Sequence, residues 1–328
     1  MPNGFPKTYV ITAAQGAQNP YHAEKYGRDG SKGRPHAKLI RNIEKYVADR
    51  RNASLEICAV PGSYVDEIEL HQDLQERPEI RMDRAVFSRL EGQRRTEQAR
   101  RDGVRDSKDH YFWRDIPDTA YRGTLERLNS KMHLVSSPTP SQNEDPLTGN
   151  LDLAQIYVGT SVVFPHPKQR LKPAPKNLSG KLPRLVLTTG ACTEPNYNTT
   201  NSRGARAARN HQYGFAVVDI FSDTLYFPRI VPALKDGSFI DMGVRYSSGQ
   251  GGRKVKTNTL VLGDLHCPVH DPVTMEANLE MINFFEPDQV IIHDLFDGRS
   301  VSHHTWGNDI ERMLLAEEGH ADLGNELE

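Results

Sequence analysis

Two stretches near the carboxyl end of the chain are its most informative part: Leu260-Val-Leu-Gly-Asp-Leu-His266 and Phe285-Glu-Pro-Asp-Gln-Val-Ile-Ile-His-Asp-Leu-Phe-Asp297. Each contains a short apolar run that ends in carboxylate and imidazole side chains. Such a run predicts a strand that is buried on both faces, as in a parallel sheet. Because α/β proteins build their sites where parallel strands end, we expect these polar side chains to meet at one edge of a sheet.

The segment between the two runs predicts a crossover helix. Its apolar residues recur at helical spacing, and Pro287 ends the pattern. A strand, a helix and a second strand in this order form a βαβ crossover, in which both loops lie at the carboxyl end of a parallel pair. The expected elements are a strand (259–263), a loop (264–272), a helix (273–285), a strand (289–293) and a loop (294–304).

This arrangement favours a metal site. Neighbouring strands lie ~5 Å apart, so the Asp264 and Asp294 carboxylates would repel each other unless a cation lay between them. A single aspartate at a strand end is usually a turn residue or a helix cap, and a single histidine is usually unremarkable. Asp-x-His and Asp-x-x-Asp after successive strands favour metal binding over that ordinary explanation. Oxygen and imidazole ligands suit Mn, Fe, Zn or Mg.

The same residues carry a family resemblance. Gly263-Asp-Leu-His266 and Pro287-Asp-Gln-Val-Ile-Ile-His-Asp-Leu-Phe-Asp-Gly298 resemble the first two sequence blocks of the calcineurin-like metallophosphoesterases. The resemblance implies two divalent ions, with Mn²⁺ favoured over Mg, Fe or Zn. It implies that Asp264 and His266 bind the first ion, that Asp294 bridges both ions, and that Asp297 supports these ligands.

The second block and Ser300-Val-Ser-His-His304 are similar to the phage branch of this superfamily, which includes the pre-early DNA-degradation protein of large tailed phages. Residues 189–197 and 211–214 resemble, more weakly, the α/β region that precedes the phosphoesterase domain in such proteins. The resemblance implies a nuclease that hydrolyses DNA phosphodiesters. Either His303 or His304 is then the candidate that contacts the substrate and protonates the leaving oxygen.

The chain departs from the family pattern at two points. His293 occupies a position where the family has glycine, and its imidazole is a supporting hydrogen-bond donor, an extra ligand or a space-filling group. The later Gly-Asn-His and histidine blocks, which complete the second metal site in the family, do not occur before Glu328. The sequence therefore suggests a fragment, a truncation or a shortened open reading frame.

The amino-terminal part predicts a second α/β region. Residues 9–12 and 55–60 are expected strands, and residues 37–51 form an expected amphipathic helix between them. The small, flexible and basic segment 247–257 is the best domain boundary. The predicted fold class is α/β, with an amino-terminal α/β domain (1–246) that binds nucleic acid or a partner, a linker (247–257) and the first β-α-β portion of a metallophosphoesterase αββα sandwich (258–328).

Several segments of the amino-terminal domain allow more than one interpretation. Residues 78–128 are rich in arginine and are interpreted as a solvated helix with ion pairs, in preference to a phosphate-binding track. The basic, proline-rich residues 165–176 are interpreted as a stiff spacer rather than a nucleic-acid contact. Strands are expected at 184–190 and 214–221, the latter continuing through a Ser222-Asp223 turn into residues 224–227.

A polar loop is expected at residues 193–211. It contains Arg203, Arg206 and Arg209, which are candidates for binding an anionic substrate. A long polar loop in a compact domain is more often functional than inert.

Composition limits the remaining possibilities. The 41 basic and 43 acidic residues nearly balance, which excludes a globally basic nucleic-acid binder but not a local basic face. Three widely spaced cysteines, no leader pattern and no run of ~20 apolar residues predict a soluble cytoplasmic protein, inside an infected bacterial host if phage-encoded. The leading hypothesis is a DNA nuclease. The alternatives are a phosphatase or nucleotidase on small or protein substrates, or a non-catalytic interaction protein that binds a host partner through its amino-terminal domain and keeps an incomplete relic site.

Overall fold

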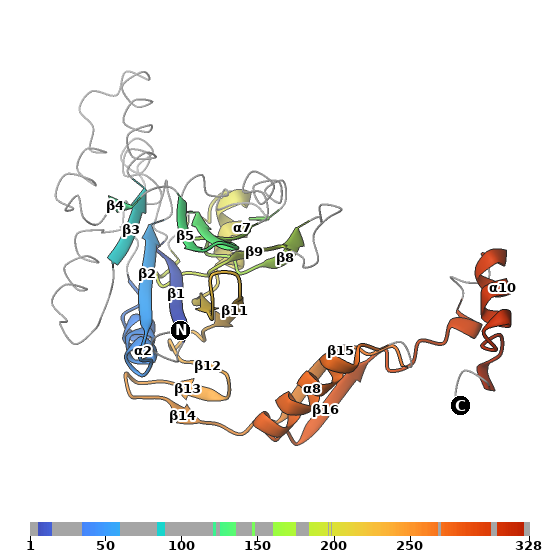
Figure 1. Cartoon of the computed structure of the whole chain (residues 1–328). Helices are drawn as coiled ribbons and strands as arrows, with labels where there is room; N and C mark the ends of the chain where they lie inside the picture. Colours follow the sequence, from blue (N-terminus) through green and yellow to red (C-terminus); the bar gives the residue numbers. More distant parts are fainter. Residues whose placement is uncertain are drawn as a thin grey trace. The chain divides into compact units, whose positions relative to one another are not determined.

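A computed structural model of the chain separates into two compact units, Met1–Arg253 and Lys254–Glu328 (Figure 1). The division falls inside the segment 247–257 that the sequence marks as a boundary. Both units are mixed α/β. The structure describes residues 6–14, 35–59, 84–88, 121–122, 125–135, 146–147, 160–174, 184–195, 197, 199–267, 270–302 and 307–324.

The described residues of the first unit form three sheets. The six-stranded sheet has the order β11-β10-β1-β2-β3-β4, the five-stranded sheet β5-β6-β7-β9-β8 and the small sheet β12-β13-β14. The strands of the first sheet are β1 (Lys7–Ala14), β2 (Ala53–Ala59), β3 (Arg84–Ser88), β4 (Tyr121–Arg122), β10 (Gly214–Ile220) and β11 (Tyr226–Pro232). Those of the others are β5 (Leu125–Asn129), β6 (Met132–Val135), β7 (Ser161–Phe164), β8 (Leu171–Ala174), β9 (Arg184–Thr188), β12 (Phe239–Asp241), β13 (Val244–Tyr246) and β14 (Arg253–Lys254).

The predicted strand–helix–strand start of the chain is confirmed. Strands β1 and β2 pair in parallel, and helix α2 (Ala37–Ala48) connects them. The Nδ1 atom of His36 accepts a hydrogen bond from the Leu39 backbone at 3.1 Å, which satisfies one free amide at the helix start. The helix ends before residue 51, the limit that the sequence predicts.

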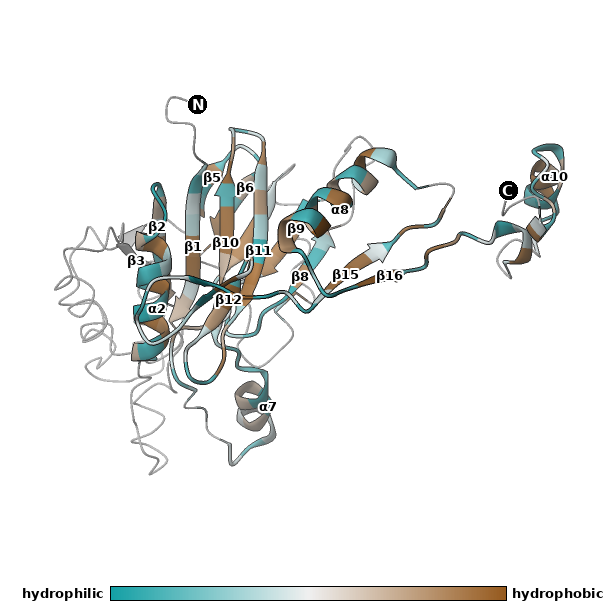
Figure 2. Ribbon diagram, turned by 90° about the horizontal axis from the view of Figure 1, so that it is seen from below, coloured by the Kyte–Doolittle hydropathy of each residue, from teal (hydrophilic) through white to brown (hydrophobic). Residues whose placement is uncertain are grey.

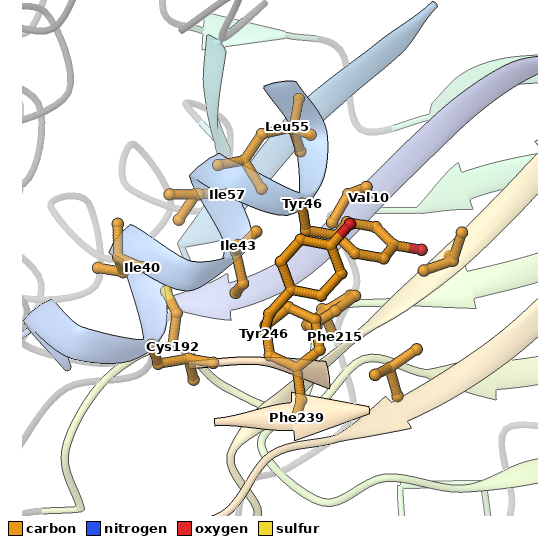
Figure 3. Close-up of a cluster of buried hydrophobic side chains, with 14 of the residues drawn as sticks. Val10, Ile40, Ile43, Tyr46, Leu55, Ile57, Cys192, Phe215, Phe239 and Tyr246 are labelled. Atoms are coloured by element: carbon orange, nitrogen blue, oxygen red, sulfur yellow. The ribbon is translucent and has the colours of Figure 1, made fainter. Parts of the chain in front are cut away.

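Helix α2 packs on one face of the six-stranded sheet (Figure 3). Its Ile43 and Tyr46 side chains are buried against Val10, Phe215 and other sheet residues. Each large apolar side chain that is fully buried contributes about 2 kcal/mol. This face of the sheet is therefore a major source of stability for the first unit.

The other face of the same sheet packs against the five-stranded sheet. Tyr9 and Ile11, which alternate with Val10 along β1, join Leu134 and Val163 in a second buried cluster. Strand β1 is therefore buried on both faces, with a helix on one side and a sheet on the other. Figure 2 shows the apolar character of this central strand region.

The spacer interpretation of residues 165–176 is wrong. Strand β8 pairs antiparallel with β9 at the edge of the five-stranded sheet, and the turn before β8 buries His166 and Gln169. Pro173 is tolerated in β8 because an edge strand has backbone groups that need no partner in the sheet. The proline and lysine content of the segment did not predict that it would be buried. Its burial depends on residues far away in the sequence, such as Thr189, whose carbonyl accepts a hydrogen bond from Gln169 Nε2 at 3.0 Å.

Two further expectations need correction. The polar segment 193–211 contains a helix, α7 (Ser202–Asn210), whose start is capped by the Asn201 side chain accepting from the Gly204 amide at 2.7 Å. Within 78–128, the described residues 84–88, 121–122 and 125–128 form strands rather than a helix. Five clustered arginines in the middle of that segment lie outside the described residues: Arg94, Arg95, Arg100, Arg101 and Arg105. The predicted β10–β11 hairpin is confirmed, with Ile220 opposite Tyr226.

The second unit contains the predicted βαβ crossover. Strand β15 (Thr259–Asp264) and strand β16 (Gln289–His293) pair in parallel, with helix α8 (Pro272–Phe285) between them in sequence. The Asp271 side chain caps the start of α8, and the left-handed Glu286 ends it before Pro287. A 3₁₀ turn, η2 (Arg299–Val301), and helix α10 (Asp309–Glu317) follow. Among the described residues of both units, no helix has the length and apolarity to cross a membrane.

The expectation that β15 and β16 are buried on both faces is wrong for this structure. Leu262 is 7% exposed, but its neighbour Val261 is 65% exposed and Ile291, paired with Val261, is 44% exposed. Side chains of a strand alternate between the two faces of a sheet, so Val261 and Ile291 share the open face. Burial on both faces needs a second covering layer, which the described part of the second unit does not supply.

Candidate metal centre

The two loops that follow β15 and β16 run side by side. The His266 amide donates to the Asp294 carbonyl at 2.8 Å, and the Cys267 amide donates to the Leu295 carbonyl at 2.9 Å. The Asp297 amide returns a hydrogen bond to the Cys267 carbonyl at 3.0 Å. These backbone hydrogen bonds extend the parallel pairing past the strand ends and hold the polar side chains of both loops at one edge of the sheet.

The backbone turns sharply at both strand ends. His266 has a φ of 51° and Asp294 has a φ of 39°, the left-handed region that non-glycine residues seldom occupy. Each such residue costs about 1 kcal/mol or more, and such strain concentrates at functional sites. The strain directs both side chains toward the same edge at a cost that a plain loop would avoid.

Three side chains gather there. Asp264, His293 and Asp294 each offer one ligand atom, and these atoms all lie within 4.8 Å of one another. His293 Nδ1 is 2.9 Å from Asp264 Oδ1 and 3.6 Å from Asp294 Oδ2. The three side chains are 56%, 69% and 58% exposed, so the cluster is open to solvent. We call Asp264, His293 and Asp294 the ligand cluster.

His266 lies beside the ligand cluster. Its Nε2 is 4.0 Å from Asp264 Oδ2, and its Nδ1 is 3.1 Å from Asp297 Oδ1, although the angles of this second contact are not those of a hydrogen bond. Asp297 is only 20% exposed, and Arg299 Nε lies 3.9 Å from its other oxygen. Asp297 therefore lies next to the His266 ring, where a small rotation of either side chain would form the hydrogen bond that carboxylates commonly make to metal-binding histidines.

The structure brings some of the predicted site residues into the ligand cluster and places others beside it. Asp264 and Asp294 meet in the ligand cluster, and His266 is adjacent through Asp264. His293, for which the sequence left three roles open, stands inside the cluster. The pairing register of the two strands could have predicted this position, because His293 is the direct cross-strand neighbour of Asp264. His303 and His304 lie outside the described residues.

The predicted substrate-binding arginines belong to the first unit. Arg206 and Arg209 are exposed on α7, whereas the side chain of Arg203 lies outside the described residues.

The donor set fits a divalent cation. Two carboxylates and one or two imidazoles offer oxygen and nitrogen to Mn, Fe, Zn or Mg. Two aspartates held this close would repel each other, and a cation removes that repulsion.

The comparisons with known proteins add no relative. No protein-family model matches the chain, and no curated protein matches it.

Proposed function

We propose that the chain is a metal-dependent phosphoesterase of the calcineurin-like type, and that its substrate is DNA. The observation that carries this proposal is the ligand cluster at the ends of two parallel neighbouring strands. There, one ligand atom from each of Asp264, His293 and Asp294 lies within 4.8 Å of the other two. The sequence resemblance of the same two strand ends to the first two blocks of that family supports it.

Each residue has a distinct role in this proposal. Asp264, Asp294 and His266 would hold the cations, and Asp297 would keep the His266 ring in place. His304 or His303 would donate a proton to the leaving oxygen. Divalent cations bound there would supply positive charge to the phosphoester and to the oxygens on which negative charge develops.

The exposure of the cluster favours a polymeric substrate over a small metabolite. Small-molecule sites usually enclose most of the ligand surface, whereas Asp264, His293 and Asp294 are more than half exposed. A phosphodiester backbone can reach such an open edge. Exposed Arg206 and Arg209 on the first unit would add sequence-independent contacts to phosphates.

The first test is Mn²⁺-dependent hydrolysis of bis(p-nitrophenyl) phosphate by the wild-type chain and by Asp294→Asn. We expect turnover to fall about 100-fold or more in the variant, because the substitution removes a ligand charge. Nicking or resection of plasmid DNA, weakening steeply with salt, then identifies a nuclease. Hydrolysis of the small ester without any action on DNA indicates a phosphatase or nucleotidase. Equal turnover in the two proteins contradicts the metal-dependent mechanism.

A second candidate function is a non-catalytic interaction protein that binds a host partner. The open apolar side chains of the second unit favour it, with Val261 65% exposed, Val273 73% and Phe284 62%. Absence of hydrolysis in a wild-type chain that does bind the cation would select this function over the enzyme.

A further inference from the structure

We propose that His293 binds the cation directly through its Nδ1 atom, alongside Asp264 and Asp294. This inference rests on the proposed function only in requiring that the ligand cluster takes a cation. It assigns a direct role to the residue that replaces the glycine of the family pattern, and it defines the chemical class of cation that this chain selects.

The distances within the cluster match neighbouring ligand positions. Two ligand atoms that each lie ~2.1 Å from one ion are ~3.0 Å apart at right angles and ~3.4 Å apart at the tetrahedral angle. His293 Nδ1 is 2.9 Å from Asp264 Oδ1 and 3.6 Å from Asp294 Oδ2. All three ligand atoms lie within 4.8 Å of one another, so side-chain adjustments of about 1 Å would bring them onto one ion.

The backbone holds the His293 ring at this position. His293 is the last residue of β16 and pairs with Asp264 across a register shift between Leu262 and Asp264. Its carbonyl accepts a hydrogen bond from the Leu265 amide at 3.2 Å. The next residue, Asp294, turns with a φ of 39°, so that adjacent side chains, which point apart in a regular strand, converge here.

A simple surface hydrogen bond or ion pair is the competing explanation, because His293 Nδ1 and Asp264 Oδ1 have hydrogen-bond geometry at 2.9 Å. Exposed pairs of this kind contribute about 0–1 kcal/mol, and His293 is 69% exposed. Such a pair does not account for the second carboxylate, Asp294, on the same nitrogen at 3.6 Å. Direct ligation accounts for both contacts at once.

An imidazole ligand changes the preferred cation. Two carboxylates alone would favour Mg²⁺, Ca²⁺ or Mn²⁺, whereas added nitrogen donors favour Fe²⁺, Co²⁺ and Zn²⁺. We infer that the ligand cluster binds Co²⁺ or Zn²⁺ in preference to Mg²⁺, and that His293 contributes to this preference together with the adjacent His266.

The test is calorimetric titration of the full chain with Co²⁺, together with the visible absorption of the bound ion. Thirteen histidines offer other binding positions, so the relevant event is the one that Asp264→Asn removes. We expect His293→Ala to weaken that event at least ~10-fold and to change its absorption. His320→Ala, which removes an exposed histidine in the turn after α10, is the matched control and should leave affinity unchanged.

Direct ligation is separated from an indirect effect by chemical rescue. In His293→Gly, free imidazole should restore both the affinity and the absorption of the bound ion, because the site is open. Unchanged affinity in His293→Ala, a lost affinity that imidazole does not restore, or no Co²⁺ binding by the wild type would each overturn the inference.

The outcome is independent of the proposed activity. Co²⁺ binding that depends on His293, without hydrolysis of any phosphoester, leaves this inference standing and removes the enzyme. Hydrolysis that depends on Asp294, together with a cation affinity that does not change in His293→Ala, supports the enzyme and overturns this inference.

Discussion

At the scale of single residues, His211 shows how burial sets a protonation state. Its Nε2 lies 2.8 Å from the Thr193 carbonyl, which can only accept, so this nitrogen carries the proton. Nδ1 then accepts from the Tyr197 hydroxyl at 3.1 Å. Burial lowers the pKa of His211 to about 4, the Thr193 carbonyl opposes this, and nearby His166 lowers the pKa further. The neutral ring is part of the folded structure.

This pKa predicts a loss of stability in mild acid. The unfolded histidine titrates near 6.5, so between pH 6.5 and about 4 the unfolded chain binds a proton that the folded chain does not. The stability that the neutral His211 ring contributes to the folded state is fully present above pH 6.5. It declines as the pH falls toward 4, by about 3 kcal/mol in total. Urea unfolding of wild type and His211→Phe at pH 7.5 and 4.5 measures it. The wild type should lose more of its free energy of unfolding than His211→Phe when the pH falls from 7.5 to 4.5. Equal losses in the two proteins would contradict the prediction.

At the scale of secondary-structure elements, Arg229 on β11 joins parts that are distant in sequence. Its Nε and Nη2 atoms donate to both oxygens of Asp241 on β12, at 2.7 and 2.9 Å, and Nη1 contacts Asp219 on β10. The Tyr46 hydroxyl of α2 donates to Asp241 at 2.6 Å. The Asp241 side chain is only 3% exposed, so its charge depends on these partners.

Removing Asp241 should therefore be costly. Asp241→Ala removes the acceptor of the Tyr46 hydroxyl and of two Arg229 nitrogens, and leaves the partly buried guanidinium with Asp219 as its remaining carboxylate. We therefore expect the free energy of unfolding to fall by about 3–5 kcal/mol. Asp223→Ala is the control. The Arg127 side chain is 60% exposed and the Asp223 side chain 71% exposed, so their ion pair should contribute less than about 1 kcal/mol to stability. Thermal and urea unfolding compare the two. Similar losses in both variants would show that the buried network has no special weight.

At the scale of the whole molecule, the two units differ in how they bury apolar residues. The first unit encloses aromatic side chains such as Phe215 and Phe239 on one face of a sheet and a second apolar cluster on the other. In the described part of the second unit, Leu262 and Leu315 are the buried large apolar residues. Open apolar surface of this kind usually marks an interaction site.

This contrast predicts binding of a hydrophobic dye by the native chain. Replacing the exposed cross-strand pair Val261 and Ile291 by lysine should lower the fluorescence of bound anilinonaphthalene sulfonate about twofold. The matched control replaces Thr259 and Gln289, the polar pair on the same face, with the same two charges. Equal dye binding by wild type and the Val261/Ile291 variant would mean that this face is covered in solution.

Local patterns were sufficient for part of the structure. Apolar runs and helical periodicity predicted β1, α2 and β2, the β10–β11 hairpin and the β15–α8–β16 crossover, because these elements form from neighbours in sequence. The same reasoning placed Asp264 and Asp294 at one sheet edge, since parallel strands joined by a crossover end on the same side.

Contacts between distant residues set the rest. The proline-rich segment became strand β8 because β9 was available to pair with it, and β1 is buried on both faces because a second sheet covers it. His293 joined the ligand cluster through the register of β16 against β15 and the turn at Asp294. Composition and periodicity report which residues prefer burial or a given backbone, but only three-dimensional packing determines which partner each residue finds.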